Sequence, residues 1–326
     1  MESKLYTFNE VVAFIKQGFL LSLAADERVL KNLPPGNWIG GTIPYFMDVD
    51  TGKFDQELIF VNIIDVKNCN YEISVYDEET ITDIIEDTYQ NGYTILILPP
   101  FQKIHENYAI QVEDLNGLYN NPIVGWIAGS DLNSDDVPKT YCGVLSEEYV
   151  NKGVAIHVEL PENKIAQVDI VNIFEQDNND DIKFYSNSFE VTNCMINGED
   201  ANLANYITNK NINTKLPLIA DYFGASINVS IKEINLEKGT VSFFAPIFKS
   251  KTYRFPKDIL DYIKHFDRQT QDLPENNVFS CNCILNYLYG EMEGKKINNV
   301  KGPITFGEIA YQLLNQTLVY LTISEI

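Results

Sequence analysis

The sequence predicts a mixed α/β fold (α+β) in which two largely antiparallel β-sheets are flanked by helices and form two fused subdomains. Helical patterns with capping residues alternate along the chain with β-prone runs. Several of these runs, such as residues 154–160, alternate apolar and polar side chains, which is typical of antiparallel strands with one buried face. The 326 residues, 45% of them hydrophobic, suffice for two cores. The asparagine-rich residues 209–214 mark a boundary, so the subdomains are predicted as residues 1–212 and 213–326.

Helices and strands alternate in the first hundred residues. Thr7 and Glu10 have the spacing of a capping box and predict a helix over residues 8–17. A weaker helical pattern covers residues 24–31, and an acidic start predicts a helix over residues 77–89. Strands are expected at residues 58–66, 71–75 and 93–98. This early region is therefore predicted to be α/β.

The middle of the chain is expected to be richer in strands. Strands are predicted at residues 154–160, 166–170, 184–194, 227–231 and 240–245. The last two are joined by a turn at residues 237–239 and form a hairpin. Helices are predicted at residues 199–208 and 216–223, and another begins at Pro256, a residue favoured in the first turn of a helix.

The C-terminal residues 279–323 carry the least generic side chains. In an extended segment side chains alternate, so Cys281 and Cys283 are expected on one face of a strand and Asn282 on the other. A helix follows from residue 284. Thr305 and Glu308 then have capping-box spacing and predict a second helix, before a closing strand at residues 318–323.

The predicted helix start around Gly307 suggests an anion site. The first backbone N–H groups of a helix lack partners within the helix and favour a carboxylate or another anion. The alternative is a capped helix with no ligand. Trp38 with the pair Gly40-Gly41 has two interpretations as well, since adjacent glycines in an apolar run form either a pocket wall or a tightly packed strand.

Composition narrows the classes of partner. The formal net charge is −22, which disfavours nucleic acid and anionic membrane surfaces as partners. The N-terminal residues have no apolar signal core, and the apolar runs are too short to span a bilayer. The five cysteines are odd in number and scattered, which suits a reducing compartment. The expectation is a cytoplasmic protein with no nucleic-acid or membrane partner.

A set of short stretches carries a resemblance to a known family that covers roughly residue 38 to the end. They are Pro122–Gly129 with the strand that follows it, Val191-Thr192, Ile196-Asn197-Gly198, Phe279-Ser280-Cys281, Gly307-Glu308-Ile309 and Asn315-Gln316-Thr317. In this order they resemble the FIST (F-box and intracellular signal transduction) sensory domains, with an N-terminal and a C-terminal part, as a divergent bacterial branch. The resemblance implies sensing of a small molecule, with an amino acid or a related metabolite as the usual ligand.

The first hypothesis for function is a cytosolic sensor that binds a small molecule, without catalysis, cofactor or metal. Its pocket is expected to be lined by Trp38, Gly40, Gly41, Trp126, Cys281, Asn282, Cys283, Thr305, Gly307 and Glu308. Thr305 and Gly307 would hold a carboxylate, and Glu308 or Asn282 an amine. Because FIST domains often accompany signalling domains, the output is expected to go to a separate signalling protein.

Two further hypotheses stay open. Cys281 or Cys283 would be a catalytic nucleophile if a helix N-terminus lowered its pKa, with Asn282, Glu308 and either His157 or His265 as helpers. The acidic surface would alternatively make the chain a protein–protein interaction module for a basic partner. Metal binding is disfavoured, because one residue between two cysteines is less than the usual ligand spacing.

Overall fold

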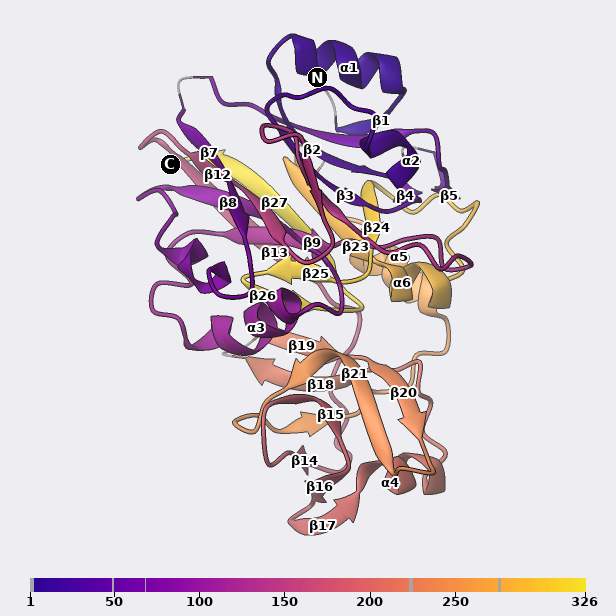
Figure 1. The fold of residues 1–326 in the computed structure, drawn as a ribbon. Helices are drawn as coiled ribbons and strands as arrows, with labels where there is room; N and C mark the ends of the chain where they lie inside the picture. Colours follow the sequence, from indigo (N-terminus) through magenta and orange to yellow (C-terminus); the bar gives the residue numbers. More distant parts are fainter. Residues whose placement is uncertain (1–2, 49, 68, 223–224, 275–276) are drawn as a thin grey trace.

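The protein consists of an upper body of three interlocked β-sheets and a smaller lower lobe (Figure 1). The computed structural model describes residues 3–48, 50–67, 69–222, 225–274 and 277–326. Its mixed α/β class and the prevalence of antiparallel pairing confirm the sequence prediction. The prediction of two sheets is wrong, because the described residues form five. The boundary at residue 212 stays a prediction; that residue lies between a helix and a strand of the lower lobe.

The three sheets of the upper body each have six strands, and these strands follow the same connection pattern in all three. The first sheet runs β1 (Lys4–Tyr6), β6 (Ile59–Ile64), β2 (Leu20–Ala25), β3 (Trp38–Thr42), β10 (Thr140–Cys142), β11 (Glu147–Tyr149). The second runs β7 (Tyr71–Tyr76), β12 (Gly153–Glu159), β8 (Gly92–Leu98), β9 (Ile123–Ile127), β25 (Glu308–Ala310), β26 (Gln312–Leu314). The third runs β13 (Lys164–Val171), β27 (Leu318–Glu325), β23 (Phe279–Cys283), β24 (Gly302–Thr305), β4 (Tyr45–Met47), β5 (Gly52–Phe54).

A parallel pair of strands lies at the centre of each sheet. The pairs are β2 with β3, β8 with β9, and β23 with β24, and every other pairing in these sheets is antiparallel. Parallel neighbours need a crossover connection, usually a helix. The helices that lie between these paired strands are α2 (Glu27–Leu30), α3 (Lys103–Gln111) and α6 (Ile284–Tyr289).

Exchange of hairpins locks the three sheets together. After β3 the chain adds β4 and β5 to the edge of the third sheet. After β9 it adds β10 and β11 to the first sheet, and after β24 it adds β25 and β26 to the second. Backbone hydrogen bonds join the crossing points, from Gly129 N to Thr42 O (2.7 Å) and from Phe306 N to Ile127 O (3.1 Å). No sheet of the upper body is therefore built from one continuous stretch of chain.

Glycine allows the closest approaches between these strands. A Cβ at Gly125 would lie 1.8 Å from the carbonyl oxygen of Leu96 on β8, and a Cβ at Gly41 would lie 2.6 Å from the Trp126 ring. Both positions exclude any larger side chain unless the backbone shifts. Of the two interpretations of Gly41, tight packing is thus the one that the structure shows.

The lower lobe, residues 182–254, forms two more sheets with a short helix near its lower end (Figure 1). One sheet runs β17 (Glu199–Asn202), β16 (Asn193–Ile196), β14 (Ile182–Lys183), β22 (Tyr253–Arg254), β18 (Leu218–Tyr222), β19 (Ala225–Val229). The other runs β15 (Ser188–Val191), β21 (Thr240–Ile247), β20 (Ile231–Asn235), and the helix is α4 (Leu203–Asn209). Buried polar contacts join lobe and body, among them Ser230 N to Asn315 Oδ1 (2.8 Å).

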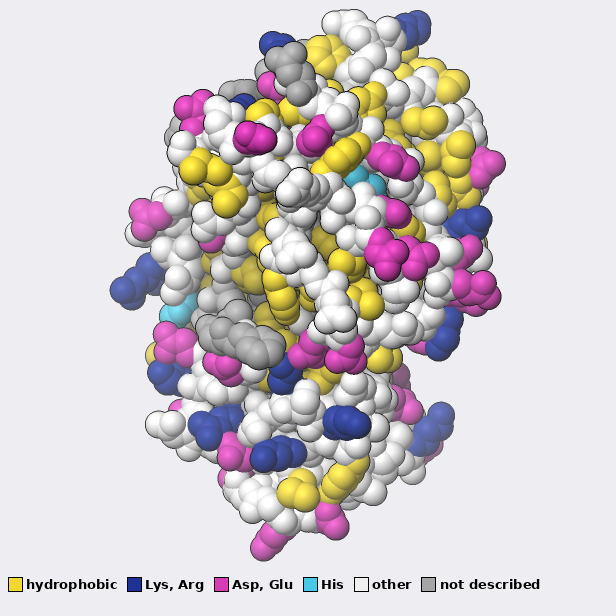
Figure 2. Space-filling view, turned by 90° about the vertical axis from the view of Figure 1, so that its left-hand side faces the viewer, with side chains coloured by type: hydrophobic (Ala, Val, Ile, Leu, Met, Phe, Trp, Pro, Cys, Tyr) yellow, Lys and Arg dark blue, Asp and Glu magenta, His cyan; other side chains and the backbone are white. Residues whose placement is uncertain are grey.

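Charge is divided unevenly between the two parts. The lower lobe holds 8 lysine and arginine residues against 6 aspartate and glutamate residues, whereas the rest of the chain holds 16 against 40. In the face that Figure 2 presents, lysine and arginine side chains gather on the lower lobe and acidic ones are spread over the upper body. The strong acidity of the chain therefore belongs to the upper body.

Several element predictions are confirmed and others are wrong. The capping box of Thr7 and Glu10 does begin a helix, α1 (Phe8–Lys16), and the hairpin at residues 237–239 is present. Residues 77–89 contain only the 3-10 turn η1 (Ile81–Ile85), residues 218–222 form a strand instead of a helix, and residues 199–202 form a strand ahead of α4. At residues 199–202 and 218–222, strand pairing overrides local helix preference. The helix predicted from Pro256 begins later, as α5 (Tyr262–Gln269), and η2 (Val112–Asp114) follows α3.

Candidate functional site

The two cysteines of β23 face a buried acidic side chain. Cys281, Cys283, Thr305, Glu308 and Thr317 form what we call the Cys–Glu cluster, and all five are at most 1% exposed. The Cys281 thiol donates to Gly125 O (3.3 Å) on the neighbouring second sheet. Glu308 is on β25, whose pairing with β9 carries it from the third sheet to the second. The Cys–Glu cluster therefore lies where two sheets meet.

Glu308 is held by hydroxyl and amide donors in this cluster. Its Oε2 accepts from the Thr317 hydroxyl (2.8 Å) and the Thr317 backbone N–H (3.3 Å), and its Oε1 accepts from the Thr305 hydroxyl (3.4 Å). Burial raises the pKa of Glu308 to about 8, although these hydrogen bonds oppose the rise. The carboxyl group is thus mainly protonated and neutral at pH 7.

The two thiols of this cluster are in an environment that suppresses their reactivity. Burial, and then the nearby Glu308 carboxyl, raise the pKa of Cys281 and of Cys283 well above the ordinary value. The expectation that a helix N-terminus lowers the pKa of either cysteine is therefore wrong. His157, a suggested helper, instead hydrogen-bonds Tyr76 (2.9 Å) and Thr94 (2.9 Å) within the second sheet.

The predicted helix after residue 305 is wrong, and with it the anion site at its start. Residues 302–305 and 308–310 are strands β24 and β25, and Phe306 N donates to Ile127 O on another sheet. Thr305 and Glu308 do make a contact, but it joins the Thr305 hydroxyl to Glu308 Oε1, whereas a capping box joins each side chain to a backbone N–H. Pairing of β25 with β9 and β26 nevertheless keeps this backbone extended. Gly307 is accordingly a crossing point between sheets.

The other predicted residues lie either on strands next to this cluster or in distant places. Asn282 points away from the cysteines, as alternation predicts, and its Oδ1 accepts from Asn286 Nδ2 (2.8 Å). Trp126 lies opposite Glu308 in the β9–β25 pair and packs on Gly41. Trp38 donates its indole N–H to Pro34 O (2.9 Å) in a separate core with α1 and α2, and Gly40 packs against that core. The structure thus brings eight of the ten residues to one region and leaves Trp38 and Gly40 outside it.

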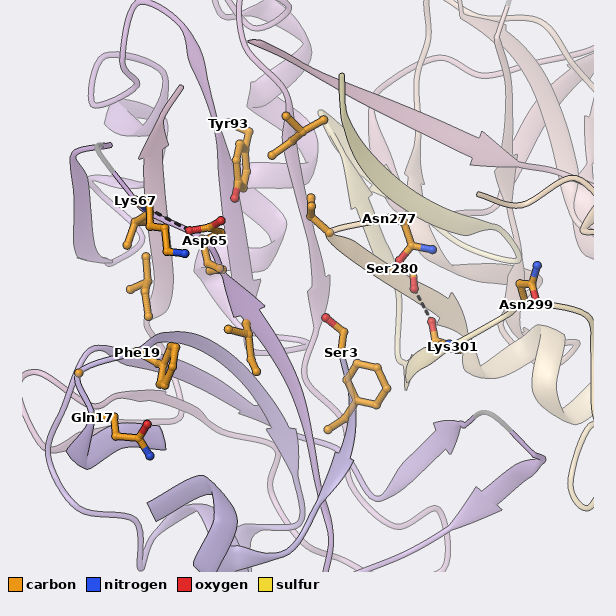
Figure 3. Close-up of a pocket in the computed structure, with 18 of the residues that line it drawn as sticks. Ser3, Gln17, Phe19, Asp65, Lys67, Tyr93, Asn277, Ser280, Asn299 and Lys301 are labelled. Carbon is orange, nitrogen blue, oxygen red and sulfur yellow. Dashed lines mark hydrogen bonds between the residues drawn. The ribbon is translucent and has the colours of Figure 1, made fainter. Parts of the chain in front are cut away.

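A cleft with a volume of about 1150 Å³ opens on the other side of β23. It lies between the first and third sheets, and its lining includes none of the ten predicted residues. Ser280 borders it, so consecutive residues of one strand, Ser280 and Cys281, face the cleft and the Cys–Glu cluster. Figure 3 shows the cleft with side chains from both ends of the chain around it.

The cleft has an apolar floor and a polar rim. The floor is formed by Leu20, Phe60, Ile64, Val278 and Ile323, with Tyr93 nearly buried beside it. The charged rim residues are Asp65, Lys67, Lys296 and Lys301. In Figure 3 the Tyr93 hydroxyl is directed toward the side where Asp65 and Lys67 lie, while Lys301 lies across the cleft. Half of the residues that line the cleft are polar or charged, so the apolar floor is bordered by an extensive polar rim.

Sequence reasoning missed these residues because none of them stands out by type. Most of the lining comes from residues 17–20, 60–67, 277–280 and 296–301, with Ser3, Tyr93 and Ile323 in addition, and these segments are far apart in the chain. One available signal was alternation in β23, which places Ser280 opposite the cysteines. A second was the three lysines in segments next to β6 and β24 of an acidic chain.

Neither a metal-binding group of side chains nor a membrane-spanning helix is found in the part of the chain that the structure describes. No group of three or more histidine, cysteine, aspartate or glutamate side chains among these residues could hold a metal ion. None of the described helices combines the length and apolar character that crossing a bilayer requires.

Comparison with known proteins gives a family and no assigned activity. No curated protein and no solved structure matches the chain. Residues 6–324 match the model of a family of unknown function, DUF6976, which covers nearly the whole length. The chain therefore belongs to the DUF6976 family.

Proposed function

We propose that this protein is a sensory protein that binds a small molecule in the cleft between the first and third sheets, without a catalytic step of its own. The observation that carries the proposal is the cleft itself, whose volume of about 1150 Å³ suits a metabolite. Its apolar floor would remove the body of a ligand from water, and the rim would orient its polar groups.

The resemblance to FIST sensory domains supports this proposal independently of the cleft. It suggests a two-part organisation and an amino acid or related metabolite as ligand, while the boundary near residue 212 and the cytoplasmic location are taken from the composition of the sequence. It also suggests a separate signalling protein as the recipient of the output. These points are part of the proposal.

The Cys–Glu cluster supports the enzyme alternative less well. A nucleophilic cysteine needs access to its substrate and a stabilised thiolate. Cys281 and Cys283 are at most 1% exposed, and burial raises the pKa of both thiols. We therefore place the ligand on the opposite face of β23, and a role of the clustered residues in binding stays a prediction.

The proposal can be tested with amino acids and small metabolites at millimolar concentration in a thermal-unfolding screen. A ligand present at about 100 times its Kd stabilises a protein by about 2.7 kcal/mol, so a Tm increase of roughly 5 °C is expected. Ile323→Trp would place a larger side chain on the apolar floor, where the body of the ligand is proposed to lie, and should reduce or abolish the shift. Ile165→Trp is the matched control, because Ile165 is 48% exposed on the neighbouring strand β13 and does not line the cleft.

Two results would contradict the proposal. One is a screen in which no compound raises the Tm of the wild-type protein. The other is a shift that persists in Ile323→Trp with unchanged affinity, which would place the ligand elsewhere.

A further inference from the structure

The charges around the cleft are opposite in sign to those of its surroundings. Outside the lower lobe the chain has 16 lysine and arginine residues against 40 aspartate and glutamate residues. The cleft rim has three lysines, Lys67, Lys296 and Lys301, against the single Asp65. A strongly acidic body repels anions at long range, so a locally basic cleft is needed if an anion is to bind there.

Two of these lysines are on one segment that is fixed against β23. In residues 296–301 the side chains of Ile297 and Val300 are buried, whereas Lys296 is exposed and Lys301 is partly exposed. The Ser280 hydroxyl donates to Lys301 O, as Figure 3 shows. A Cβ at Gly302 would lie 2.4 Å from Ser280 O, so glycine permits this close approach. The segment therefore presents two ammonium groups from a fixed backbone.

These ammonium groups have no carboxylate partner among the residues that the structure describes. The ion pairs of the described chain include neither Lys296 nor Lys301, and Lys67 is likewise absent from them. Asn299 adds an amide beside the two lysines at the rim. Ammonium and amide N–H groups are hydrogen-bond donors that suit carboxylate or phosphate oxygens.

The opposite end of the cleft has mixed polarity. Asp65 and Lys67 lie there with the Tyr93 hydroxyl, and Asp65 already accepts from the Lys67 backbone N–H (3.1 Å). Between the two ends lies the apolar floor with Leu20 and Phe60. An occupant that satisfies all three zones has an anionic head, an apolar middle and a smaller polar end.

We propose that the ligand of this cleft is an organic anion, with a carboxylate or phosphate group held by Lys296 and Lys301 and an apolar body on the Leu20–Phe60 floor. This inference rests on the proposed function, since it assigns a ligand class to the same cleft. It also predicts that binding weakens as salt concentration rises, because rim charges are screened.

The test compares head groups on identical bodies. Hexyl, phenylpropyl and indolylpropyl compounds are each offered with a carboxylate, a phosphate, a primary amide or an ammonium head, and Kd is measured by titration calorimetry and ligand-observed NMR. For every body that binds, the Kd of the better anion should be about tenfold lower than that of the amide. The ammonium compound should bind most weakly. The carboxylate and phosphate arms distinguish the two sources of negative charge.

Matched charge variants assign the effect to the cleft. K296Q/K301Q should raise the Kd of the anions about tenfold and leave that of the amides unchanged. K183Q/K238Q is the control, because both lysines are exposed in the lower lobe and the net charge changes by the same amount. Anion affinity in this control should equal that of the wild type.

The outcomes separate the two proposals. If amides or ammonium compounds bind as tightly as the anions and Ile323→Trp still blocks them, the anion inference is overturned and the proposed cleft function stands. Equal loss of anion affinity in both double variants also overturns the inference, since it indicates a general charge effect. If no compound of any head group binds the wild type, both proposals fail.

Discussion

The two faces of β23 differ in what their residues can reach. On one face Cys281 and Cys283 meet Glu308 in a packed cluster, at most 1% exposed. On the other face Ser280 borders a cleft of about 1150 Å³ whose lining has no unusual residue type. The cysteine and glutamate side chains, which have the more reactive groups, are thus buried. The side chains that line the accessible cleft are of common types. We therefore base the proposed binding site on access and unpaired charge rather than on residue type.

The comparison of the two faces predicts that substitutions in the Cys–Glu cluster mainly lower the free energy of unfolding. Glu308→Lys would place an ammonium group where a neutral carboxyl is fully buried and would leave Thr317 without its acceptor. We expect the free energy of unfolding to fall by about 3–5 kcal/mol, as for an uncompensated buried charge. Denaturant titration measures this. Lys301→Gln on the cleft rim should change stability by less than about 0.5 kcal/mol, and equal effects of the two substitutions would contradict the contrast.

Alkylation of the cysteines tests whether the Cys–Glu cluster is closed. Iodoacetamide at neutral pH should label the partly exposed Cys69 at least about a hundredfold faster than Cys281 or Cys283, because the latter are buried and burial raises the pKa of their thiols. Mass spectrometry of peptides after timed quenching gives the rates. All five cysteines should react in urea. Rapid native labelling of Cys281 would revive the cysteine-enzyme hypothesis.

The pH dependence of stability should reveal Glu308 directly. Burial raises its pKa to about 8, above an unfolded value of 4.5, so the folded state retains a proton that the unfolded chain releases. Rising pH then favours unfolding, and this contribution to stability is lost between about pH 4.5 and pH 8. From pH 6 to pH 8 the wild type should lose about 2 kcal/mol more than Glu308→Gln. Parallel curves for the two proteins would show that Glu308 is not the group responsible.

The smallest effect is expected on the cleft face of β23. Ser280→Ala removes the hydroxyl that donates to Lys301 O and should lower the free energy of unfolding by about 1 kcal/mol. Because that contact fixes the lysine segment, the same variant should also weaken anion binding at the cleft. Calorimetry with the best carboxylate compound measures the second effect. A loss of stability with unchanged Kd would mean that the hydrogen bond does not position Lys301.

Local patterns predicted what depends on local structure. The capping box of Thr7 and Glu10 gave the start of α1, and alternation correctly placed Cys281 and Cys283 opposite Asn282. The same spacing at Thr305 and Glu308 gave a wrong helix prediction, because the pairing of β25 with β9 keeps the backbone extended there. The cleft was out of reach for a related reason. Its lining joins residues 17–20 to residues 296–301, and no pattern within either segment indicates the other.

The position of β27 in the third sheet has a consequence for the order of folding. β27 pairs along its length with β13 and also with β23, so it is an inner strand, although it comes last of the sheet's strands in the chain. During synthesis β13 and β23 emerge from the ribosome before the strand that separates them. The sheet therefore cannot close until residue 325 has left the exit tunnel, and until then both earlier strands expose edges on which chaperones can act.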